Sequence, residues 1–282
     1  MLVKMLTNKS IGFLGAGNLA EALIKGLLAS KKVGPGQIVV SDRIIGRITH
    51  LAETYEIKVY ARNYEVARNA DIIFLTVKPN DVTGVLKEIA SEIAVDKLLI
   101  SAAAGITTTA VQETLKEAGM ARSIPVVRVM PNTPAIVQEG ATAICAGMGA
   151  GKAELKLVRT LFESVGKVVV IDDEPLMDAV TGVSGSGPAY VFLFIEALGE
   201  AGVAAGLRED TAKLLAAQTV LGAARLALES PKTLEELVKM VASPGGTTVA
   251  GIKKLEEAGF KGIVTEAVEA AIKRAKELSG AG

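Results

Sequence analysis

Residues 11–20 read IGFLGAGNLA, an apolar run followed by a glycine-rich turn. Gly15, Gly17 and Ala20 form the pattern Gly-x-Gly-x-x-Ala, and the next residues have the composition of a helix. In a strand–turn–helix unit the first glycine permits the tight turn, the second lets backbone approach a pyrophosphate, and the small third residue allows close packing. The helix N-terminus then offers free N–H groups. The stretch therefore predicts the first turn of a dinucleotide-binding fold.

The same alternation of strand and helix continues over the next 150 or so residues. Apolar, β-branched runs lie at 11–15, 38–41, 57–60, 71–77, 97–101, 125–130, 141–146 and 167–172, and candidate helices at 18–30, 43–55, 79–93 and 107–118. The first six runs are continuously apolar, as expected for strands covered on both faces. The order predicts an α/β class with a doubly wound, mainly parallel Rossmann-type sheet. We expect the last two runs to add antiparallel strands at its edge.

The second part of the chain has a different pattern. Residues 175–278 are rich in Ala, Leu, Glu and Lys and contain no further β-rich run, which predicts five or six helices. Pro188 suits the first turn of one of them. We therefore expect two domains, a dinucleotide-binding domain over 1–172 and an all-helical domain over 173–282. The segment 212–228 is so apolar that a helix there needs cover on most sides, which favours a homodimer built from this half.

Composition narrows the class of protein further. The 282 residues carry 31 basic and 31 acidic side chains, so nothing indicates a nucleic-acid partner or an anionic membrane surface. One cysteine excludes an intrachain disulfide. Residues 1–10 lack the pattern of a secretory signal, and the most apolar run, 190–195, meets Glu196 far short of the roughly 20 residues of a membrane span. We expect a soluble, cytoplasmic protein.

The end of the second predicted strand bears on which dinucleotide binds. Ser41, Asp42 and Arg43 stand where a Rossmann fold meets the adenine ribose. An acidic residue there bonds the 2′-hydroxyl of NAD, whereas an arginine accommodates the 2′-phosphate of NADP. Asp42 argues for NAD unless it turns outward. We favour NADPH, with NADH also used.

Two further strand ends predict the nicotinamide side of the site. The fourth predicted strand ends in Val77-Lys78-Pro79, and the fifth is followed by Ala102-Ala103-Ala104-Gly105. Ligands of open α/β sheets bind outside the carboxyl ends of the strands, where small residues let a flat ring lie close to backbone. Lys78 is placed to face ribose hydroxyls, although a surface lysine at a helix start is the alternative.

The residues that many alcohol dehydrogenases use as a base are missing. The single histidine, His50, falls inside the second predicted helix and reads as a surface residue, while Cys145 lies in an apolar strand and reads as core. We find no His, Asp or Glu cluster that predicts a metal site. Reduction of a C=N bond fits this shortage, because a protonated imine is already an electrophile and needs orientation more than a strong acid.

Several motifs together resemble the pyrroline-5-carboxylate reductase family, in order and over nearly the whole chain. They are IGFLGAGNLA (11–20), DIIFLTVKPN (71–80), ISAAAGIT (100–107), VVRVMPNTPAIVQEGATAICAG (126–147), DAVTGVSGSGPAYVFLFIEAL (178–198) and VASPGGTTVAGIKKLEEAGF (241–260). GSGPAY and SPGGTT are the specific ones, whereas the first motif occurs in many dehydrogenases. The resemblance implies NAD(P)H-dependent reduction of 1-pyrroline-5-carboxylate to L-proline. It also implies a Rossmann domain followed by an all-helical dimerisation domain, with homodimers that often assemble into homodecamers.

The resemblance also implies roles for individual residues. It assigns the cofactor to Gly15, Ala16, Gly17, Asn18, Leu19, Ala20, Ser41, Arg43, Asn63, Val77, Lys78, Pro79, Ala103, Ala104 and Gly105. It assigns the substrate to Met130, Pro131, Asn132, Ser243, Pro244, Gly245, Gly246, Thr247 and Thr248, with Thr248 near the ring nitrogen as the catalytic residue. A Gly-Gly loop at a helix start presents backbone N–H groups that suit a small carboxylate without an arginine.

Two other readings stay open on sequence grounds. The nearest is an enzyme of the same architecture but other chemistry, either a β-hydroxyacid dehydrogenase or a deazaflavin-dependent NADP reductase. The first needs a catalytic lysine on a helix of the second domain, and the lysines there, at 213, 232, 239, 253 and 254, lack an apolar setting that would depress a pKa. The other is a non-catalytic NADPH sensor that dimerises through its helices.

Overall fold

The computed structural model describes residue 6 and residues 8–279, and its contacts divide the chain into two compact units. The first comprises the residues up to Ser186 together with those from Ala271 onward, and the second is Gly187–Ala270. This division differs from the expected boundary after residue 172, because 173–186 and 271–279 are grouped with the sheet. Most of the N-terminal segment on which the absence of a secretory signal was argued lies outside the described residues.

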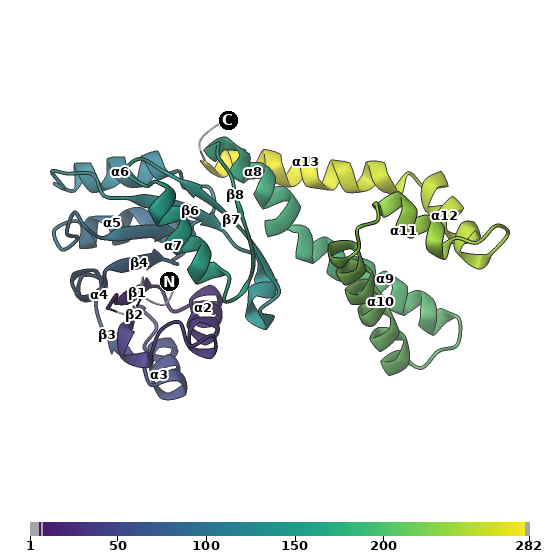
Figure 1. Ribbon diagram of the computed structural model, residues 1–282, viewed down its shortest axis with the longest axis horizontal. Coiled ribbons are helices and arrows are strands. Elements are labelled where there is room, and N and C mark those ends of the chain that lie inside the picture. The colour runs from purple at the N-terminus through teal and green to yellow at the C-terminus, as the bar shows by residue number, and fades with distance from the viewer. Residues whose placement is uncertain (1–5, 7, 280–282) are drawn as a thin grey trace. The chain divides into compact units, whose positions relative to one another are not determined.

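The first unit is built on one eight-stranded sheet (Figure 1). Its strands are β1 (Ile11–Leu14), β2 (Ile38–Ser41), β3 (Lys58–Tyr60), β4 (Ile72–Leu75), β5 (Leu98–Ser101), β6 (Val126–Met130), β7 (Gly140–Ala146) and β8 (Gly166–Val170). The order is β3-β2-β1-β4-β5-β6-β7-β8, and the first six are parallel. β7 is antiparallel to β6 and parallel to β8, so the last two strands run against the others. The predicted α/β class and the two reversed edge strands are confirmed.

Helices cover both faces of this sheet. They are α2 (Asn18–Ala29), α3 (Ile45–Tyr55), α4 (Asn63–Asn69), α5 (Val82–Ile89), α6 (Thr108–Glu117) and α7 (Lys152–Phe162). Apolar residues of the six parallel strands alternate between two buried clusters, one containing side chains of α2, α3 and α7 and the other side chains of α4, α5 and α6. Ala143 and Cys145 of β7 enter a third, smaller cluster. On the first face Phe13 stacks on Phe74 with 4.7 Å between ring centroids. Continuous apolar strands are thus explained by burial on both sides.

Some boundaries differ from the sequence expectation. The stretch predicted as one helix over 79–93 is a 3₁₀ turn, Pro79–Asp81, followed by α5, which ends at Ile89. Three further 3₁₀ turns cover Pro35–Gln37, Thr133–Val137 and Glu174–Leu176. The helices α4 and α7 lie between strands where no helix had been predicted. The expectation that Cys145 is a core residue is confirmed, since its exposed fraction is 1%.

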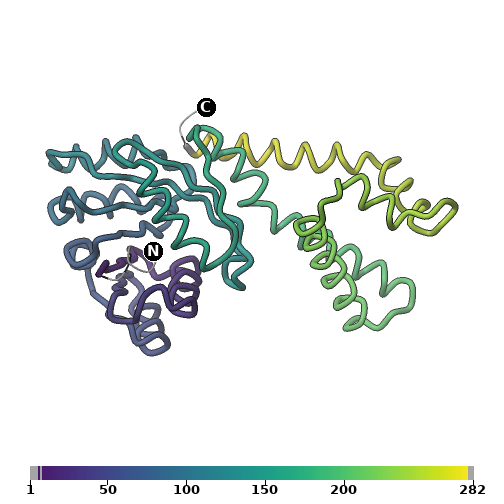
Figure 2. The backbone as a smooth tube through the Cα atoms, in the orientation of Figure 1, coloured from purple at the N-terminus to yellow at the C-terminus, as the bar shows by residue number. Residues whose placement is uncertain are grey.

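The rest of the chain is helical, as predicted (Figure 2). After α8 (Met177–Val180) and a π-helical turn, Thr181–Gly185, come α9 (Gly187–Ala204), α10 (Glu209–Glu229), α11 (Leu234–Val241), α12 (Thr247–Glu257) and α13 (Phe260–Ser279). Pro188 is the second residue of α9, where its missing N–H costs nothing. The apolar segment predicted to need cover lies within α10, whose Leu214, Leu221 and Leu228 are more than half exposed.

One helical stretch has the length and composition of a membrane span. Among the described residues this is Glu174–Ala204 alone; no residue of its most apolar 18-residue window is buried, whereas Met177 and Asp178 near its start are. Length and composition by themselves are weak evidence, because apolar helices that pack against a second chain have the same character.

Candidate active site

The glycine-rich turn between β1 and α2 has the geometry that its sequence predicts. Gly15 has φ +105°, and a Cβ there would lie 3.0 Å from backbone atoms of Thr76 and Val77. Gly17 has φ −73° and ψ −178°, and a Cβ there would meet nothing within 4 Å. Ala20 is fully buried in the packing of α2 on the sheet. The first glycine is therefore required by the fold, whereas the second leaves an open space above the turn.

A cavity of about 450 Å³ lies at this turn and at the carboxyl ends of β2 and β4. It brings together the predicted residues Gly15, Ala16, Gly17, Arg43, Asn63, Val77 and Lys78. Its other lining residues were not predicted as site residues, and they are Asp42, Ile44, Arg47, Thr76, Asp81, Gly84, Val85 and Glu88. The carboxyl edge of a parallel sheet is the expected ligand position for this fold.

Asp42 turns towards the glycine-rich turn. Its Oδ2 accepts a hydrogen bond from the Ala16 N–H at 2.7 Å, and its Oδ1 accepts one from the Ile44 N–H at 2.8 Å. The carboxylate therefore ties the end of β2 to the turn of β1. Because both of its oxygens accept backbone N–H groups, the Asp42 carboxylate points towards the protein backbone and not outward into solvent.

Ser41 and Asn63 form a pair at the same strand end. The Ser41 side chain is 1% exposed and its Oγ donates to Asn63 Oδ1 at 2.8 Å. The Asn63 amide in turn donates to Glu88 Oε2 at 2.7 Å. Ser41 thus supports Asn63 from within the core, while Asn63 lines the cavity. The position of Ser41 at a strand end could not reveal that Ser41 is buried and that Asn63 lines the cavity.

Two arginines flank the cavity. Arg43 is largely exposed and its Nη1 lies 3.3 Å from Asp81 Oδ1. Arg47, four residues later on α3, donates from Nε to the Ala16 carbonyl at 3.0 Å and from Nη2 to Glu21 at 2.8 Å. Sequence reasoning missed Arg47. Arg47 follows Arg43 by four residues, about one turn of the helix predicted over 43–55, and this spacing could have indicated that both arginines flank the same site.

Glu21 joins these groups to the histidine. Burial acts to raise the pKa of Glu21, but hydrogen bonds from Arg47 and His50 outweigh it and lower that pKa below its usual value. The Nε2 atom of His50 lies 3.0 Å from Glu21, and half of the histidine side chain is exposed. The expectation that His50 is a surface residue is confirmed.

Of the residues predicted for the nicotinamide side, Val77 and Lys78 line this cavity, whereas those at 103–105 lie outside it. Ala103 is buried in the core beside α6, and Ala104 is half-buried. Gly105 has φ +73°, and a Cβ there would lie 3.1 Å from backbone of Leu278 near the end of α13. The remaining predicted cofactor residues, Asn18, Leu19, Ala20 and Pro79, start α2 and the 3₁₀ turn after β4 without lining the cavity.

The predicted substrate residues at the end of β6 and just after it lie close to Ser184 and to Gly185, the first residue of the GSGP motif. Asn132 Oδ1 accepts from the Ala141 N–H at 2.8 Å, and its Nδ2 lies 3.4 Å from Ser184 Oγ. A Cβ at Gly185 would lie 2.6 Å from Met130 Cε. Pro131, which lies between Met130 and Asn132 in the sequence, is half-buried. Two motifs far apart in sequence therefore meet within the first unit.

The SPGGTT loop lies in the second unit, directly before α12. The helix begins at Thr247, with Gly246 as its N-cap and no side chain capping it. Gly245 has φ +74°, and the Gly246 N–H donates to the Ser243 carbonyl at 3.0 Å. Thr248, in the first turn, is half-buried, while Pro244 and Thr247 are exposed. The predicted Gly-Gly entry to a helix is confirmed, and its binding role stays a prediction.

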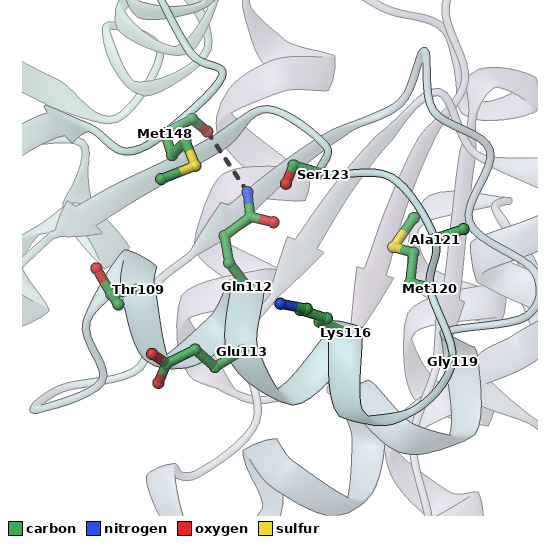
Figure 3. A pocket seen from close by; sticks show the side chains of 9 residues that line it. All are labelled: Thr109, Gln112, Glu113, Lys116, Gly119, Met120, Ala121, Ser123 and Met148. Atoms are coloured by element: carbon green, nitrogen blue, oxygen red, sulfur yellow. Dashed lines mark hydrogen bonds between the residues drawn. The ribbon is translucent and has the colours of Figure 1, made fainter.

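A second hollow, of about 580 Å³, lies on the outer side of α6 (Figure 3). The Gln112 side chain crosses it and donates to the carbonyls of Ile124 at 2.5 Å and Met148 at 3.4 Å. None of the predicted site residues lines it. Within residue 6 and residues 8–279, no group of three or more His, Cys, Asp or Glu side chains is placed to hold a metal ion.

Family models match both parts of the chain. Residues 174–278 match the model described as pyrroline-5-carboxylate reductase dimerisation, and residues 10–105 match the model described as NADP oxidoreductase, coenzyme F420-dependent. The pyrroline-5-carboxylate reductase of Arabidopsis thaliana is 42% identical over 95% of this chain and 95% of its own length.

Solved structures give the same picture. A pyrroline-5-carboxylate reductase from Coxiella burnetii superposes with a TM-score of 0.89 at 38% identity, covering 96% of this chain and 98% of that one. The pyrroline carboxylate reductase of Plasmodium falciparum, solved with NADP bound, gives a TM-score of 0.85 at 33% identity with the same coverage.

Proposed function

The chain belongs to the pyrroline-5-carboxylate reductase family, and from this premise we propose that it reduces 1-pyrroline-5-carboxylate to L-proline with NADPH, NADH being an alternative donor. The observation that carries the proposal is identity above 40% over nearly the full length of a named reductase. We further propose a cytoplasmic location, and a boundary near residue 173 between the dinucleotide-binding domain and the helical domain.

The first unit fits a dinucleotide. Gly17 leaves open space where a pyrophosphate would lie, and α2 begins at the next residue, so its free N–H groups and positive dipole end face that space. Gly15, Ala16 and Asn18 to Ala20 would hold the pyrophosphate. Asn63 and Arg43 would meet the adenosine, with Ser41 acting through Asn63. Val77, Lys78, Pro79 and the stretch 103–105 would line the nicotinamide riboside.

Arg43 and Arg47 favour NADPH over NADH. Asp42 accepts one backbone N–H on each carboxylate oxygen, which holds it against the glycine-rich turn; each oxygen keeps a second acceptor site, so NADH stays the alternative donor. Two guanidinium groups beside the cavity supply the donors that a 2′-phosphate prefers.

The helical unit would bind the imine. The backbone N–H groups of Gly245, Thr247 and Thr248 would hold the carboxylate, since that of Gly246 is bonded to the Ser243 carbonyl. The hydroxyls of Ser243 and Thr247 would add donors. Thr248 would donate to the ring nitrogen as it becomes an amine. We propose Met130, Pro131 and Asn132 on the first unit, and Pro244 on the helical unit, as further substrate-binding residues. When bound, the reduced nicotinamide supplies a hydride to the C=N carbon, and no protein base of the histidine type is required.

We also propose that the helical unit forms a homodimer, and that dimers associate further into decamers. The match of 174–278 to a dimerisation model supports the first step. The exposed leucines of α10 and the exposed Phe192 and Leu193 of α9 support it independently, because a water-facing patch of this kind marks an interaction surface.

The β-hydroxyacid dehydrogenase alternative finds no support in the lysines of the helical unit. Lys239, Lys253 and Lys254 are each more than 70% exposed, and each lies within 4 Å of a glutamate. Such surface ion pairs do not create the apolar setting that activates a lysine.

Oxidation of NADPH followed by absorbance tests the proposal. Purified protein with NADPH and 1-pyrroline-5-carboxylate should consume the cofactor and yield L-proline in equal amounts. A β-hydroxyacid with NADP⁺ and a reduced deazaflavin with NADP⁺ serve as competing substrates. Turnover with either of these and none with the imine would refute the proposal, and binding of NADPH without any turnover would favour the sensor.

A further inference from the structure

A buried group of charges lies where the sheet meets the chain leading into the helical unit. The Arg128 side chain, on β6, is 5% exposed. Its Nη1 lies 3.3 Å from Glu174 Oε1 and its Nη2 3.7 Å from Asp178 Oδ1. Glu174 starts a 3₁₀ turn and Asp178 lies in α8. A buried guanidinium is tolerable only with such partners, because an unpaired buried charge is strongly destabilising.

Glu174 also caps the start of α6. Its Oε1 accepts from the Thr108 N–H at 2.8 Å and its Oε2 accepts from Thr108 Oγ1 at 2.6 Å. Thr107 Oγ1 accepts from the Ala110 N–H at 3.1 Å, so the helix has a second cap of the ordinary local kind. The carboxylate comes from a residue 66 positions away. It therefore fixes where α6 begins in space, which a local cap cannot do.

The start of α6 is the end of the loop assigned to the nicotinamide riboside. This loop, 102–106, is held at its other end by β5, whose Ser101 pairs in register with Arg128. Thr108 is 4% exposed and close to Gly147, where a Cβ would lie 2.4 Å from the threonine. One end of the loop is thus fixed by the backbone pairing of Ser101 with β4 and β6, and the other end is held by Glu174 at Thr108.

We propose that Glu174, with its charge balanced by Arg128, is a positioning residue that holds the 102–106 loop in the position required for hydride transfer from the nicotinamide. This inference rests on the proposed function, since it takes the loop as the nicotinamide side of the site. Glu174 touches neither cofactor nor imine in this account. It acts through Thr108 and the first turn of α6.

The test compares Glu174→Gln with the control Glu154→Gln. Glu154 caps α7 by accepting from the Gly151 N–H at 2.8 Å, so the control loses a capping carboxylate of the same unit away from the site. Glutamine at 174 keeps one acceptor oxygen and loses the charge. We expect kcat of Glu174→Gln to fall about tenfold or more, since small misplacements of reacting groups have effects of this size. The Kd for NADPH should stay within about twofold, because the adenosine half is held elsewhere.

Two readouts separate positioning from general damage. The kinetic isotope effect with NADPH deuterated at C4 should rise in Glu174→Gln, because hydride transfer becomes more rate-limiting. Backbone hydrogen exchange over 103–111, measured in the protein as purified, should accelerate in Glu174→Gln and not in Glu154→Gln. Thr108→Val should change both in the same direction, and Thr108→Ser should restore them.

Every outcome decides the matter. Faster exchange with unchanged kcat and isotope effect would make Glu174 merely structural and overturn the inference. Lower kcat with unchanged exchange would overturn it too, because the route through α6 would be wrong. If the unaltered chain did not reduce the imine, the proposed function would fail, whereas unchanged exchange in Glu174→Gln would separately refute the link between Glu174 and the loop.

Discussion

Replacing Gly17 by alanine should separate folding from cofactor binding. The backbone at Gly17, with φ −73° and ψ −178°, is one that alanine adopts readily, and its Cβ would meet nothing within 4 Å. A glycine replaced at such a compatible position stabilises a protein by about 0.4–1 kcal/mol, chiefly by restricting the unfolded chain. The same methyl group would stand where the pyrophosphate approaches the turn. We expect the Kd for NADPH to rise about 10- to 100-fold, equivalent to about 1.4–2.8 kcal/mol.

Gly15→Ala is the matched contrast two residues away. There φ is +105° and the new Cβ would lie 3.0 Å from backbone of Thr76 and Val77. Strain of this kind costs about 1–3 kcal/mol, so this variant should lose both stability and binding. Gly36→Ala, in open space within the turn Pro35–Gln37, should leave binding unchanged and, like Gly17→Ala, stabilise the protein by up to about 1 kcal/mol.

Urea unfolding and titration of NADPH fluorescence measure the two effects. The reasoning would be refuted if Gly17→Ala bound NADPH as tightly as the unaltered chain, since the turn would then not be the pyrophosphate site. It would fail equally if Gly17→Ala were destabilised by more than 1 kcal/mol, because the open space above the turn would not exist in solution.

Three further predictions follow from other parts of the chain. Thr248→Ala should lower kcat/KM by about 10- to 100-fold at unchanged Kd for NADPH, which is the scale of one lost hydrogen bond. Gly246→Val should lower kcat/KM further, because a Cβ at this position would lie 2.6 Å from Ser243 Oγ. Steady-state kinetics equal to those of the unaltered chain would remove the loop from the mechanism. Leu221→Glu should give monomers in sedimentation experiments at micromolar protein, whereas an unchanged dimer would exclude α10 from the interface. Asp71→Asn should lower Tm near pH 7 but not near pH 2. Burial acts to raise the pKa of Asp71, but hydrogen bonds from Ser10 and the charge of Lys9 lower it overall, so its contribution is present above about pH 4 and is lost as pH falls through the lower folded value. Parallel Tm profiles for both proteins would contradict this.

Local patterns were enough to predict the sheet and most of its helices. All eight apolar runs became strands. In β1, β2, β4 and β5 every residue is buried, because continuously apolar sequence of this kind requires cover on both faces. The helix α4, NYEVARN, has only seven residues and few apolar positions, so it lacks the periodicity that identifies longer helices. It forms because Val66 and Ala67 pack on the sheet.

Side-chain direction was harder to predict than position. Ser41, Asp42 and Asn63 were recognised as neighbours of the adenosine, but the hydrogen bond from Ser41 to Asn63 depends on two strands meeting in register. The sequence around Glu174 did not indicate that its side chain caps α6. Its partner Thr108 is 66 residues away, and nothing in the local sequence of either residue indicates the other.

The division of α13 between the two units has a consequence for biosynthesis. Residues 271–279 return to the unit that begins at the other end of the chain, and Leu278 covers Gly105 there. That unit is therefore discontinuous along the polypeptide, and a nascent chain cannot complete it until the last helix has emerged from the ribosome. A bulky group attached shortly after Leu278 would lie close to this contact, which makes a long flexible spacer the better choice for labelling this end.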